Sequence, residues 1–400
     1  MTRRTVPLPE YGASVPVQLT GADLRVLQTV PRERLLATPT MEPGLFTLRA
    51  SSWVGTVELD TVRVRVVPKV DDLRNVLGMF ASAAGLADWS VRASDYADAD
   101  VVEGIAELVL RTIDQATRRG LVHGYRSRME RLPVLRGRLL VAELAARPWD
   151  PWPAPCAYDD FTADVAENRV LLAAVKAIRG WPLPPEVRRL SADLMSRFEE
   201  VSDASDPWTE AESIRESPLN EHYMPALRLA AIVLEGAGVA HGAGDREAVS
   251  FLVDMNKLYE RWIGAELATR LWPTLQVLEQ RSVALSRRPR VSMQPDLLFR
   301  EGGRNVLVGD VKYKLTGSGL ARNEDYYQLL AYATALDLPR GILIYCQADD
   351  APARHLTVVG GEQDLVCYPL DLGGPWKDVG ERLDELADVV QHLRVPSYSS

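Results

Sequence analysis

The residues of this chain that are best suited to catalysis are two aspartates and a lysine in its last third. Pro295-Asp296 opens one predicted strand, and Asp310-Val311-Lys312 ends the next one, after a short turn at 301–304. Successive side chains of a strand point to opposite faces, so Asp310 and Lys312 are expected on one face and Val311 on the other. A hairpin register would then bring Asp296 beside Asp310.

This combination of side chains fits the hydrolysis of a phosphodiester bond. Carboxylate oxygens are preferred ligands of Mg²⁺, which keeps coordination positions for water and phosphate. We therefore expect Asp296 and Asp310 to bind Mg²⁺, or Mn²⁺ in its place. Lys312 would polarise the attacking water or stabilise the charge on the pentavalent phosphorus. The alternative is that Asp310 and Lys312 form a surface ion pair without a catalytic role.

The elements expected around these residues form a mixed α/β domain with a central sheet flanked by helices. Hydrophobic periodicity predicts a long helix over about 248–271, strands near 275–285, 294–299 and 305–312, a helix over 325–336 and a strand over 341–345. Two further short strands and a helix around 379–392 complete this region. It is expected to form a domain over residues 244–400.

Residues 1–243 are expected to form a second region, β-rich at its start and helical in its second half. The alternation predicts a hairpin of two strands over 54–60 and 62–67. Helices are expected over 73–84, 105–120, 165–178, 186–201 and 224–234, with a proline-rich connector at 147–155 and an acidic loop at 202–220. The glycines at 236–244 are spaced one residue too widely for a dinucleotide-binding motif and indicate a flexible linker.

Composition excludes several other classes of protein. The 400 residues are 46% hydrophobic and 25% charged, which is typical of a folded globular protein. No apolar run is long enough to span a membrane and no secretory signal is expected, so the predicted location is the cytoplasm. The three cysteines and five histidines are scattered, which argues against a disulfide framework or a zinc enzyme. A net charge of −9 weighs against binding nucleic acid by bulk positive potential.

The order of these elements resembles the PD-(D/E)XK nuclease superfamily. Pro-Asp starts a strand, Asp-x-Lys follows an apolar strand, and the preceding helix carries Glu260, where this superfamily often has a further acidic residue. The following helix holds Gln328 with Tyr332 one turn later, a pair that recurs at that point in many members. The resemblance implies that Glu260 and Gln328 assist the site, Glu260 as an additional metal ligand.

The chain as a whole resembles the McrC family, the nuclease subunits of McrBC-type modification-dependent restriction systems. The similarity runs from about Trp53 to about Leu370 and is carried by segments 54–57, 66–69, 135–138, 156–171, 254–260, 295–296 and 309–314. It implies a DNA-cutting subunit that docks on McrB, a GTP-powered AAA+ ring that recognises modified double-stranded DNA. The chain contains no GxxxxGK motif followed by Ser or Thr, so it is not expected to bind nucleotide by itself.

Several basic residues have two open interpretations. Seven arginines lie between residues 118 and 138 with only Glu130 opposing them. They could contact an acidic partner, DNA phosphates or a neighbour's GTP site, or they could form a solvated face paired within the chain. The docking candidates are Arg126, Arg128, Arg136 and Arg138. The candidates for contact with the DNA backbone, with a solvated turn as the alternative, are Arg287, Arg288, Arg290 and Lys314.

An acidic group lies between these two basic segments. Asp159, Asp160, Asp164 and Glu167 could bind a cation, but their place at the start of a predicted helix favours capping and structural hydrogen bonds.

Two other functions remain open from the sequence. The chain could be an adaptor with an inactive site that only stimulates the AAA+ GTPase. It could also be a stand-alone PD-(D/E)XK nuclease of a repair or mobile-element system. The intact Asp296, Asp310 and Lys312 argue against the first, and the ordered similarity of the N-terminal region argues against the second.

Overall fold

The computed structural model describes residues 4–70, 72–86, 101–237, 250–286, 291–313, 323–347, 353–359 and 363–394. It confirms the predicted mixed α/β fold. Two compact units are present, one formed by residues 1–105 together with 239–400 and the other by residues 106–238. The N-terminal 105 residues thus share a unit with the C-terminal region, whereas the sequence suggested one division between 243 and 244. That expected boundary and most of the expected glycine linker lie outside the described residues.

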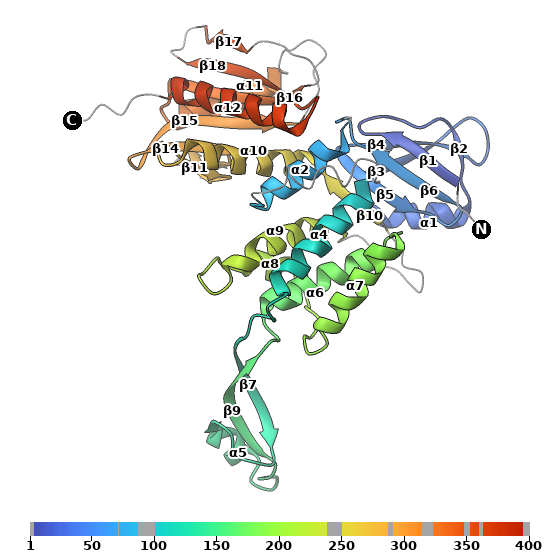
Figure 1. Ribbon diagram of the computed structural model, residues 1–400, viewed down its shortest axis with the longest axis vertical. Coiled ribbons are helices and arrows are strands. Elements are labelled where there is room, and N and C mark those ends of the chain that lie inside the picture. Colours follow the sequence, from blue (N-terminus) through green and yellow to red (C-terminus); the bar gives the residue numbers. More distant parts are fainter. Residues whose placement is uncertain are drawn as a thin grey trace. The chain divides into compact units, whose positions relative to one another are not determined.

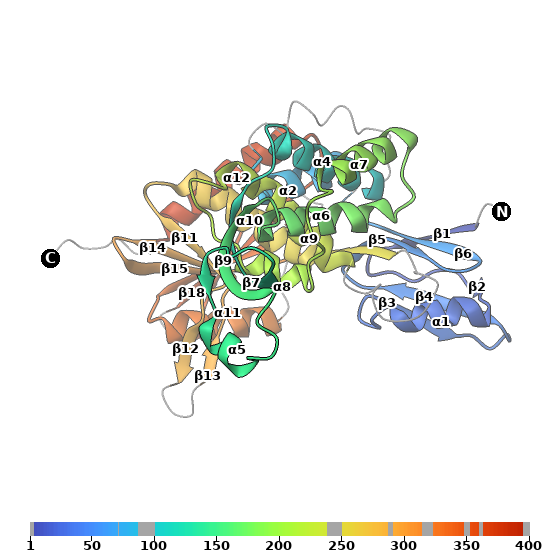
Figure 2. The same cartoon turned by 90° about the horizontal axis from the view of Figure 1, so that it is seen from below.

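The first unit begins with two small sheets that share a hydrophobic core. One has the order β1-β6-β5-β10 and the other the order β2-β4-β3. Their strands are β1 (Arg4–Pro9), β2 (Val17–Gln18), β3 (Leu35–Pro39), β4 (Leu45–Ala50), β5 (Trp53–Glu58), β6 (Val62–Val67) and β10 (Ser250–Asp254). Helix α1 (Gly21–Thr29) contacts β3 beside the second sheet (Figure 2). The predicted hairpin is confirmed, because β5 and β6 are antiparallel with Val57 opposite Val64.

Strand β10 corrects the prediction of one helix over 248–271. Residues 250–254 pair with β5 in antiparallel register, and Phe251, Leu252 and Val253 are buried. Helix α10 (Met255–Leu271) starts only afterwards, with the Asp254 side chain accepting a hydrogen bond from the Asn256 backbone N–H as its N-cap. A helical pattern had concealed a short apolar strand whose partner lies about two hundred residues earlier in the chain. The long helix therefore leaves directly from the N-terminal sheet.

The central sheet of the first unit has the order β11-β14-β15-β16-β18-β17. Its strands are β11 (Gln276–Glu279), β14 (Leu297–Glu301), β15 (Arg304–Lys312), β16 (Arg340–Gln347), β17 (Arg354–Thr357) and β18 (Asp364–Asp371). The pairs β11–β14, β14–β15 and β17–β18 are antiparallel, and β15–β16 and β16–β18 are parallel. A separate hairpin joins β12 (Val283–Ser286) and β13 (Val291–Met293).

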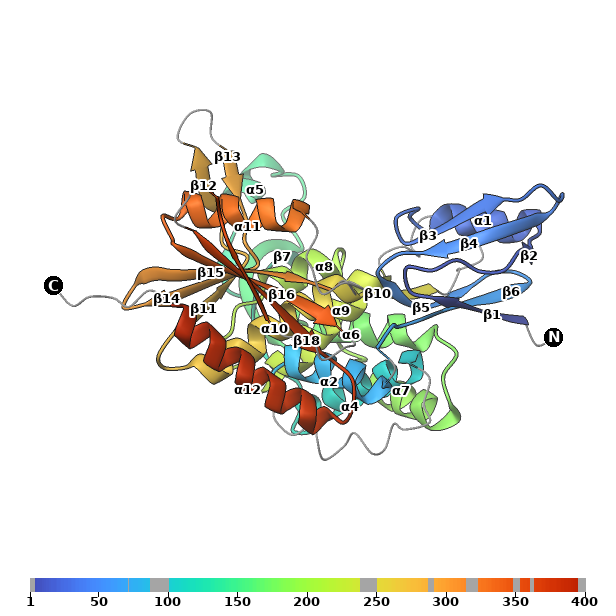
Figure 3. The same cartoon turned by 90° about the horizontal axis from the view of Figure 1, so that it is seen from above.

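Helices cover both faces of this sheet, as the sequence predicted. Helix α11 (Asn323–Ala335) packs on one face, and α10 with α12 (Trp376–Leu393) packs on the other (Figure 3). The α11 face has a core that includes Leu298, Val308, Leu329 and Leu343. Helix α2 (Leu73–Ala83), also predicted, contacts α10.

The second unit consists of helices and an extended strand ladder. Its helices are most of α4 (Val101–Thr117), α5 (Val141–Ala146), α6 (Ala166–Arg179), α7 (Pro185–Arg197), α8 (Pro207–Ser213), η2 (Glu221–Tyr223) and α9 (Met224–Ala237). The predicted acidic loop at 202–220 is wrong in part, because Asp206 caps α8 and Pro207 occupies its first turn. None of the helices in the described ranges has the length and apolar character that crossing a membrane requires.

The strand ladder of the second unit was not predicted. Strand β7 (Gly124–Leu132) pairs with β9 (Ala154–Thr162) along its whole length, and the short β8 (Arg138–Leu139) pairs with the other edge of β9. The ladder extends from the helices of its unit, with α5 near its far end (Figure 1). Much of its surface is exposed and charged, so it lacks the hydrophobic alternation by which a half-buried strand is recognised.

Candidate active site

The ends of β14 and β15 bring the two predicted aspartates together. Leu297 lies opposite Gly309, and continuing this register by one residue places Asp296 opposite Asp310. The Oδ2 atom of Asp296 accepts a hydrogen bond of 2.8 Å from the backbone N–H of Val311. Asp310 is fully buried, on the strand face that also carries Val308. The sheet thus fixes Asp296 to the backbone of the strand that carries Asp310.

Lys312 shares the strand face of Asp310, as the spacing predicted. Its Nζ atom lies 2.7 Å from Oδ2 of Asp310, and its side chain is 18% exposed. Since Asp310 itself has no exposed surface, this is not the surface ion pair that the sequence left as an alternative. Neither oxygen of Asp310 makes a hydrogen bond of regular geometry to a described residue, and the ion pair to Lys312 is formed through Oδ2. A buried carboxylate that lacks hydrogen bonds is costly, so it calls for a ligand or a proton.

The charges of this site perturb one another strongly. Burial, followed by the charge of Asp296, raises the pKa of Glu260 on α10 to about 8. The same two causes raise the pKa of Asp310 well above its usual value. Burial opposes the ammonium form of Lys312, but the charges of Asp310 and Asp296 outweigh it and raise the pKa of this lysine. Without a cation, the site therefore retains protons near neutral pH.

The donor set fits a hard divalent cation. Asp310 offers an unpartnered oxygen, and Asp296 and Glu260 add carboxylates whose mutual repulsion a cation would relieve. No three carboxylate, histidine or cysteine side chains converge as a ready-made metal site anywhere in the described ranges. Mg²⁺ commonly binds through only one or two carboxylates and keeps several waters. Asp296 and Asp310 meet that smaller requirement.

Gln328 lies on α11, where it is exposed, and contacts the site through Tyr332. Its amide donates a hydrogen bond of 2.6 Å to the Tyr332 hydroxyl. That hydroxyl lies 3.3 Å from the backbone carbonyl of Gln294, to which it donates. Gln328 therefore acts on the segment that precedes Asp296, and no contact between its amide and a site carboxylate is described.

Two further site residues were missed from the sequence. Asp325 is buried in the first turn of α11 and accepts a hydrogen bond of 2.5 Å from the Tyr345 hydroxyl. Tyr345 lies on β16, next to Lys312 in the parallel register. The charge of Asp325 also favours the ammonium form of Lys312, a smaller contribution to the raised pKa than that of Asp310. An acid in a first helical turn usually has a helix-capping or dipole role, so only the fold identifies Asp325 as a neighbour of the site.

Most of the predicted docking arginines form ion pairs with acids on β9 or just after it. Arg126 pairs with Asp164, and both Arg128 and Arg136 pair with Asp160. Arg138 is exposed and makes no ion pair to a residue that the structure describes. The four residues expected near DNA, Arg287, Arg288, Arg290 and Lys314, lie outside the described residues.

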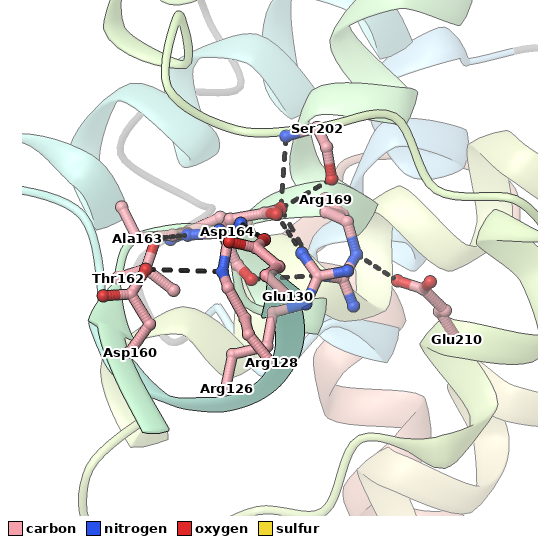
Figure 4. Close-up of polar contacts among 11 residues, drawn as sticks. Arg126, Arg128, Glu130, Asp160, Thr162, Ala163, Asp164, Arg169, Ser202 and Glu210 are labelled. Carbon is pink, nitrogen blue, oxygen red and sulfur yellow. Dashed lines mark hydrogen bonds and ion pairs between the residues drawn. The ribbon is translucent and has the colours of Figure 1, made fainter. Parts of the chain in front are cut away.

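Asp164 is the centre of a polar cluster at the base of the strand ladder (Figure 4). Its Oδ1 atom accepts hydrogen bonds from the Ser202 hydroxyl at 2.8 Å and the Ser202 backbone N–H at 3.1 Å. Arg169 of α6 contacts the Asp164 carbonyl at 3.0 Å and also Glu210 of α8 at 3.0 Å. Burial raises the pKa of Asp164, but these hydrogen bonds and the charge of Arg126 outweigh it and lower the pKa. The cluster joins the ladder to two helices, which agrees with the structural role favoured for these acids.

Comparison with known proteins places the chain in a family. The sequence profile of the McrBC family, described as "McrBC 5-methylcytosine restriction system component", matches residues 48–346. The chain belongs to the McrBC family. The match includes Glu260, Asp296, Asp310, Lys312 and Gln328. The McrBC-type membership that the sequence motifs suggested is thereby confirmed.

A solved structure that matches this chain has a similar fold. It is a chain of the "refined half-complex from tetradecameric assembly of Thermococcus gammatolerans McrB AAA+ hexamers with bound McrC". It is 18% identical, with a TM-score of 0.56 over 96% of this chain and 100% of that one. A chain of the Thermococcus gammatolerans McrBC complex is 19% identical, with a TM-score of 0.44 over 67% of this chain and 88% of that one. The search of curated proteins found no match.

Proposed function

We propose that this chain is the Mg²⁺-dependent DNA endonuclease subunit of a GTP-driven, modification-dependent restriction complex of the McrBC type. The observation that carries the proposal is the geometry of Asp310. It is fully buried, lacks hydrogen bonds to described residues at both oxygens, lies opposite Asp296 and is ion-paired with Lys312 at 2.7 Å. A restriction system needs one component that cuts DNA, and this group of side chains is suited to hydrolysing a phosphodiester.

Each site residue has a separate task in this proposal. Bound by Asp296 and Asp310, a Mg²⁺ ion would supply Lewis-acid chemistry and a water of lowered pKa. Lys312 keeps its proton, because neighbouring carboxylates raise its pKa. It therefore acts as a fixed cation for the charge that develops on phosphorus, and not as a general base. Glu260 adds a third carboxyl group, which would lose its proton when a cation is bound nearby.

The GTP-driven motor of such a complex would have to be a partner protein. The chain contains no phosphate-binding loop of the GxxxxGK type. In the Thermococcus gammatolerans assembly, AAA+ hexamers of McrB carry bound McrC, and we assign the same kind of AAA+ GTPase partner to this chain. The partner would select modified double-stranded DNA, which agrees with the family's description as a 5-methylcytosine restriction component. We further propose the strand ladder, with Arg126, Arg128, Arg136 and Arg138, as a docking surface.

The experiment is plasmid cleavage by the full chain with and without its AAA+ partner. Methylated and unmethylated plasmids are incubated with Mg²⁺ and GTP, and GTP hydrolysis is followed in the same reactions. The proposal predicts cleavage of the methylated plasmid only when chain, partner, GTP and Mg²⁺ are all present. Stimulation of GTP hydrolysis without any cleavage would contradict it and favour the adaptor function. Cleavage without the partner would favour a stand-alone nuclease.

A further inference from the structure

A polar cluster from the N-terminal sheet contacts the chain immediately after the catalytic lysine. Lys69, which follows β6, donates a hydrogen bond of 2.9 Å from its Nζ atom to the backbone carbonyl of Tyr313. The same ammonium group lies 3.8 Å from the centroid of the Tyr313 ring, a cation–π contact. Tyr313 is 1% exposed and directly follows Lys312. Lys69 thus contacts both the backbone and the side chain of the residue that follows β15.

Glu10, the residue after β1, also contacts Tyr313. Its Oε2 atom accepts hydrogen bonds of 3.2 Å from the Tyr313 hydroxyl and of 3.2 Å from the Lys69 backbone N–H. Glu10 is 7% exposed, so these bonds are formed in a desolvated place. Tyr313 is therefore fixed at its carbonyl, its ring and its hydroxyl by two residues that are more than 200 positions away in the sequence.

The same cluster also contacts the other catalytic element, helix α10. The hydroxyl of Tyr11 donates a hydrogen bond of 3.0 Å to Oδ1 of Asn256, in the first turn of α10. Asn256 lies one helical turn before Glu260. The Tyr11 ring in turn lies 5.1 Å from Nζ of Lys69. One group of side chains therefore contacts the two segments that carry Lys312 and Glu260.

Packing alone does not explain this arrangement. Burial of Lys69 disfavours its charge and lowers its pKa, and apolar side chains of similar size could fill the place at a lower cost. Apolar side chains could not form the directional hydrogen bonds to the Tyr313 carbonyl and the Tyr313 hydroxyl. Such bonds define the position of a strand end more narrowly than hydrophobic contact does.

We propose that Glu10, Tyr11 and Lys69 form a positioning cluster that sets the places of Lys312 and Glu260 for DNA cleavage. The inference rests on the proposed nuclease function. The three residues do not touch the reacting atoms, and they act through Tyr313 and Asn256. Small displacements of a catalytic group are sufficient for a large loss of rate, on the order of 100-fold for about 1 Å.

The test compares Lys69→Met with Lys69→Arg and Tyr11→Phe in the complete complex with the AAA+ partner. Lys69→Met keeps the length of the side chain and removes its charge and hydrogen bond, whereas Lys69→Arg retains both. The matched control is Asp23→Asn, because Asp23 is also buried in the N-terminal region but bonds only to Thr20 and Thr61. Single-turnover cleavage of methylated plasmid is measured over a range of DNA concentrations, together with GTP hydrolysis and thermal unfolding.

The expected result is a lower maximal cleavage rate with unchanged DNA binding. Lys69→Met should lose roughly 10- to 100-fold in maximal rate, and Lys69→Arg should recover part of that loss. The DNA concentration at half-maximal rate and the stimulated GTP hydrolysis should stay at the values of the unmodified chain. Tyr11→Phe removes one hydroxyl only, so it should fold and still show a lower rate. Asp23→Asn should lower thermal stability without lowering the maximal rate.

Two results would overturn the inference while the nuclease function stands. One is a Lys69→Met complex that cuts as fast as the unmodified one. The other is an equal loss of rate in Asp23→Asn, which would make the effect one of general stability. If Lys69→Met does not fold, the inference is overturned when Tyr11→Phe cleaves at the same maximal rate as the unmodified chain. An unmodified complex that fails to cut would refute the nuclease function itself and the inference with it.

Discussion

Lys312 Nζ lies 2.7 Å from Oδ2 of Asp310, two residues earlier on the same strand, and Asp310 is completely buried. The pair is therefore formed where water does not screen it. Neither oxygen of Asp310 has a hydrogen bond to another described residue, and the ion pair to Lys312 is formed through Oδ2. In the proposed function, Oδ2 orients the lysine and Oδ1 would bind the cation. A two-residue spacing on a strand would then serve both a metal and a fixed positive charge.

The protons held by the site make stability depend on pH. The pKa of Glu260 is about 8 in the folded chain and its ordinary value is 4.5, so the folded state binds more protons between these limits. The free energy of unfolding therefore falls as pH rises through this window. Glu260→Gln should remove this contribution. The free energy of unfolding of Glu260→Gln, relative to that of the unmodified chain, should therefore rise by about 1 to 2 kcal/mol between pH 6 and pH 8 in EDTA.

Denaturant unfolding at the two pH values measures this difference. Mg²⁺ provides the control, because it should favour the ionised carboxylates and reduce the advantage of Glu260→Gln at pH 8. If both proteins lost stability equally between pH 6 and pH 8, Glu260 would not carry the proton that the structure assigns to it.

Asp164 should be important for the stability of the second unit. Asp164→Asn would remove one of the two acids that pair with the largely buried Arg169, the other being Glu210, and it would weaken two bonds to Ser202. We expect a loss of about 2 to 4 kcal/mol in the free energy of unfolding. Asp203→Asn is the control, because Asp203 is exposed and pairs only with Lys176 at the surface, which should cost at most about 1 kcal/mol. Equal urea midpoints for the two variants would show that the Asp164 cluster is not stabilising.

Gly55 should be indispensable for the pairing of β5 with β10. Its φ is +142°, and a Cβ atom there would lie 2.1 Å from the carbonyl oxygen of Phe251. Gly55→Ala is therefore expected to cost at least about 2 kcal/mol in unfolding experiments. Gly380→Ala, on α12 with no atom within 4 Å of the added methyl, should be neutral or stabilise by up to about 1 kcal/mol. A stable Gly55→Ala variant would contradict the register in which the chain leaves the N-terminal sheet for α10.

Arg138 is the best candidate for a contact with the partner among the four predicted arginines. It is exposed and has no ion pair to a described residue, whereas Arg126, Arg128 and Arg136 are paired within the ladder region. Arg138→Glu should weaken stimulation of the partner's GTP hydrolysis by roughly tenfold, with a strong dependence on salt. Arg179→Glu, an exposed charge reversal at the end of α6, is the control. A similar loss in both variants would indicate bulk charge instead of a specific contact.

The elements of the site could be predicted because their signals are local. Strand β6 alternates clearly, β15 contains a short continuous apolar run, and the parity of Asp310 and Lys312 follows from strand geometry alone. Strand β10 could not be separated from α10, because its identity depends on pairing with the distant β5. The ladder of β7 and β9 was hidden by exposed arginines, which find their counter-charges on the opposite strand.

The supporting residues escaped prediction for a related reason. Asp325, Tyr345 and Lys69 have ordinary local contexts, and only tertiary contacts bring them to the site. The burial that changes their chemistry is a property of the assembled core. A hydrophobic pattern predicts that a core exists but does not identify which polar side chain it encloses.

The most direct test of the nuclease assignment compares Asp310→Asn and Lys312→Met with the unmodified chain, each in complex with the AAA+ partner. Cleavage of methylated plasmid and GTP hydrolysis are measured in one reaction with Mg²⁺. We predict that both substitutions reduce cleavage by at least about 100-fold, because each removes a charge from the reacting centre, and that both leave GTP hydrolysis fully stimulated. Cleavage at the unmodified rate by either variant would contradict the assignment of this site.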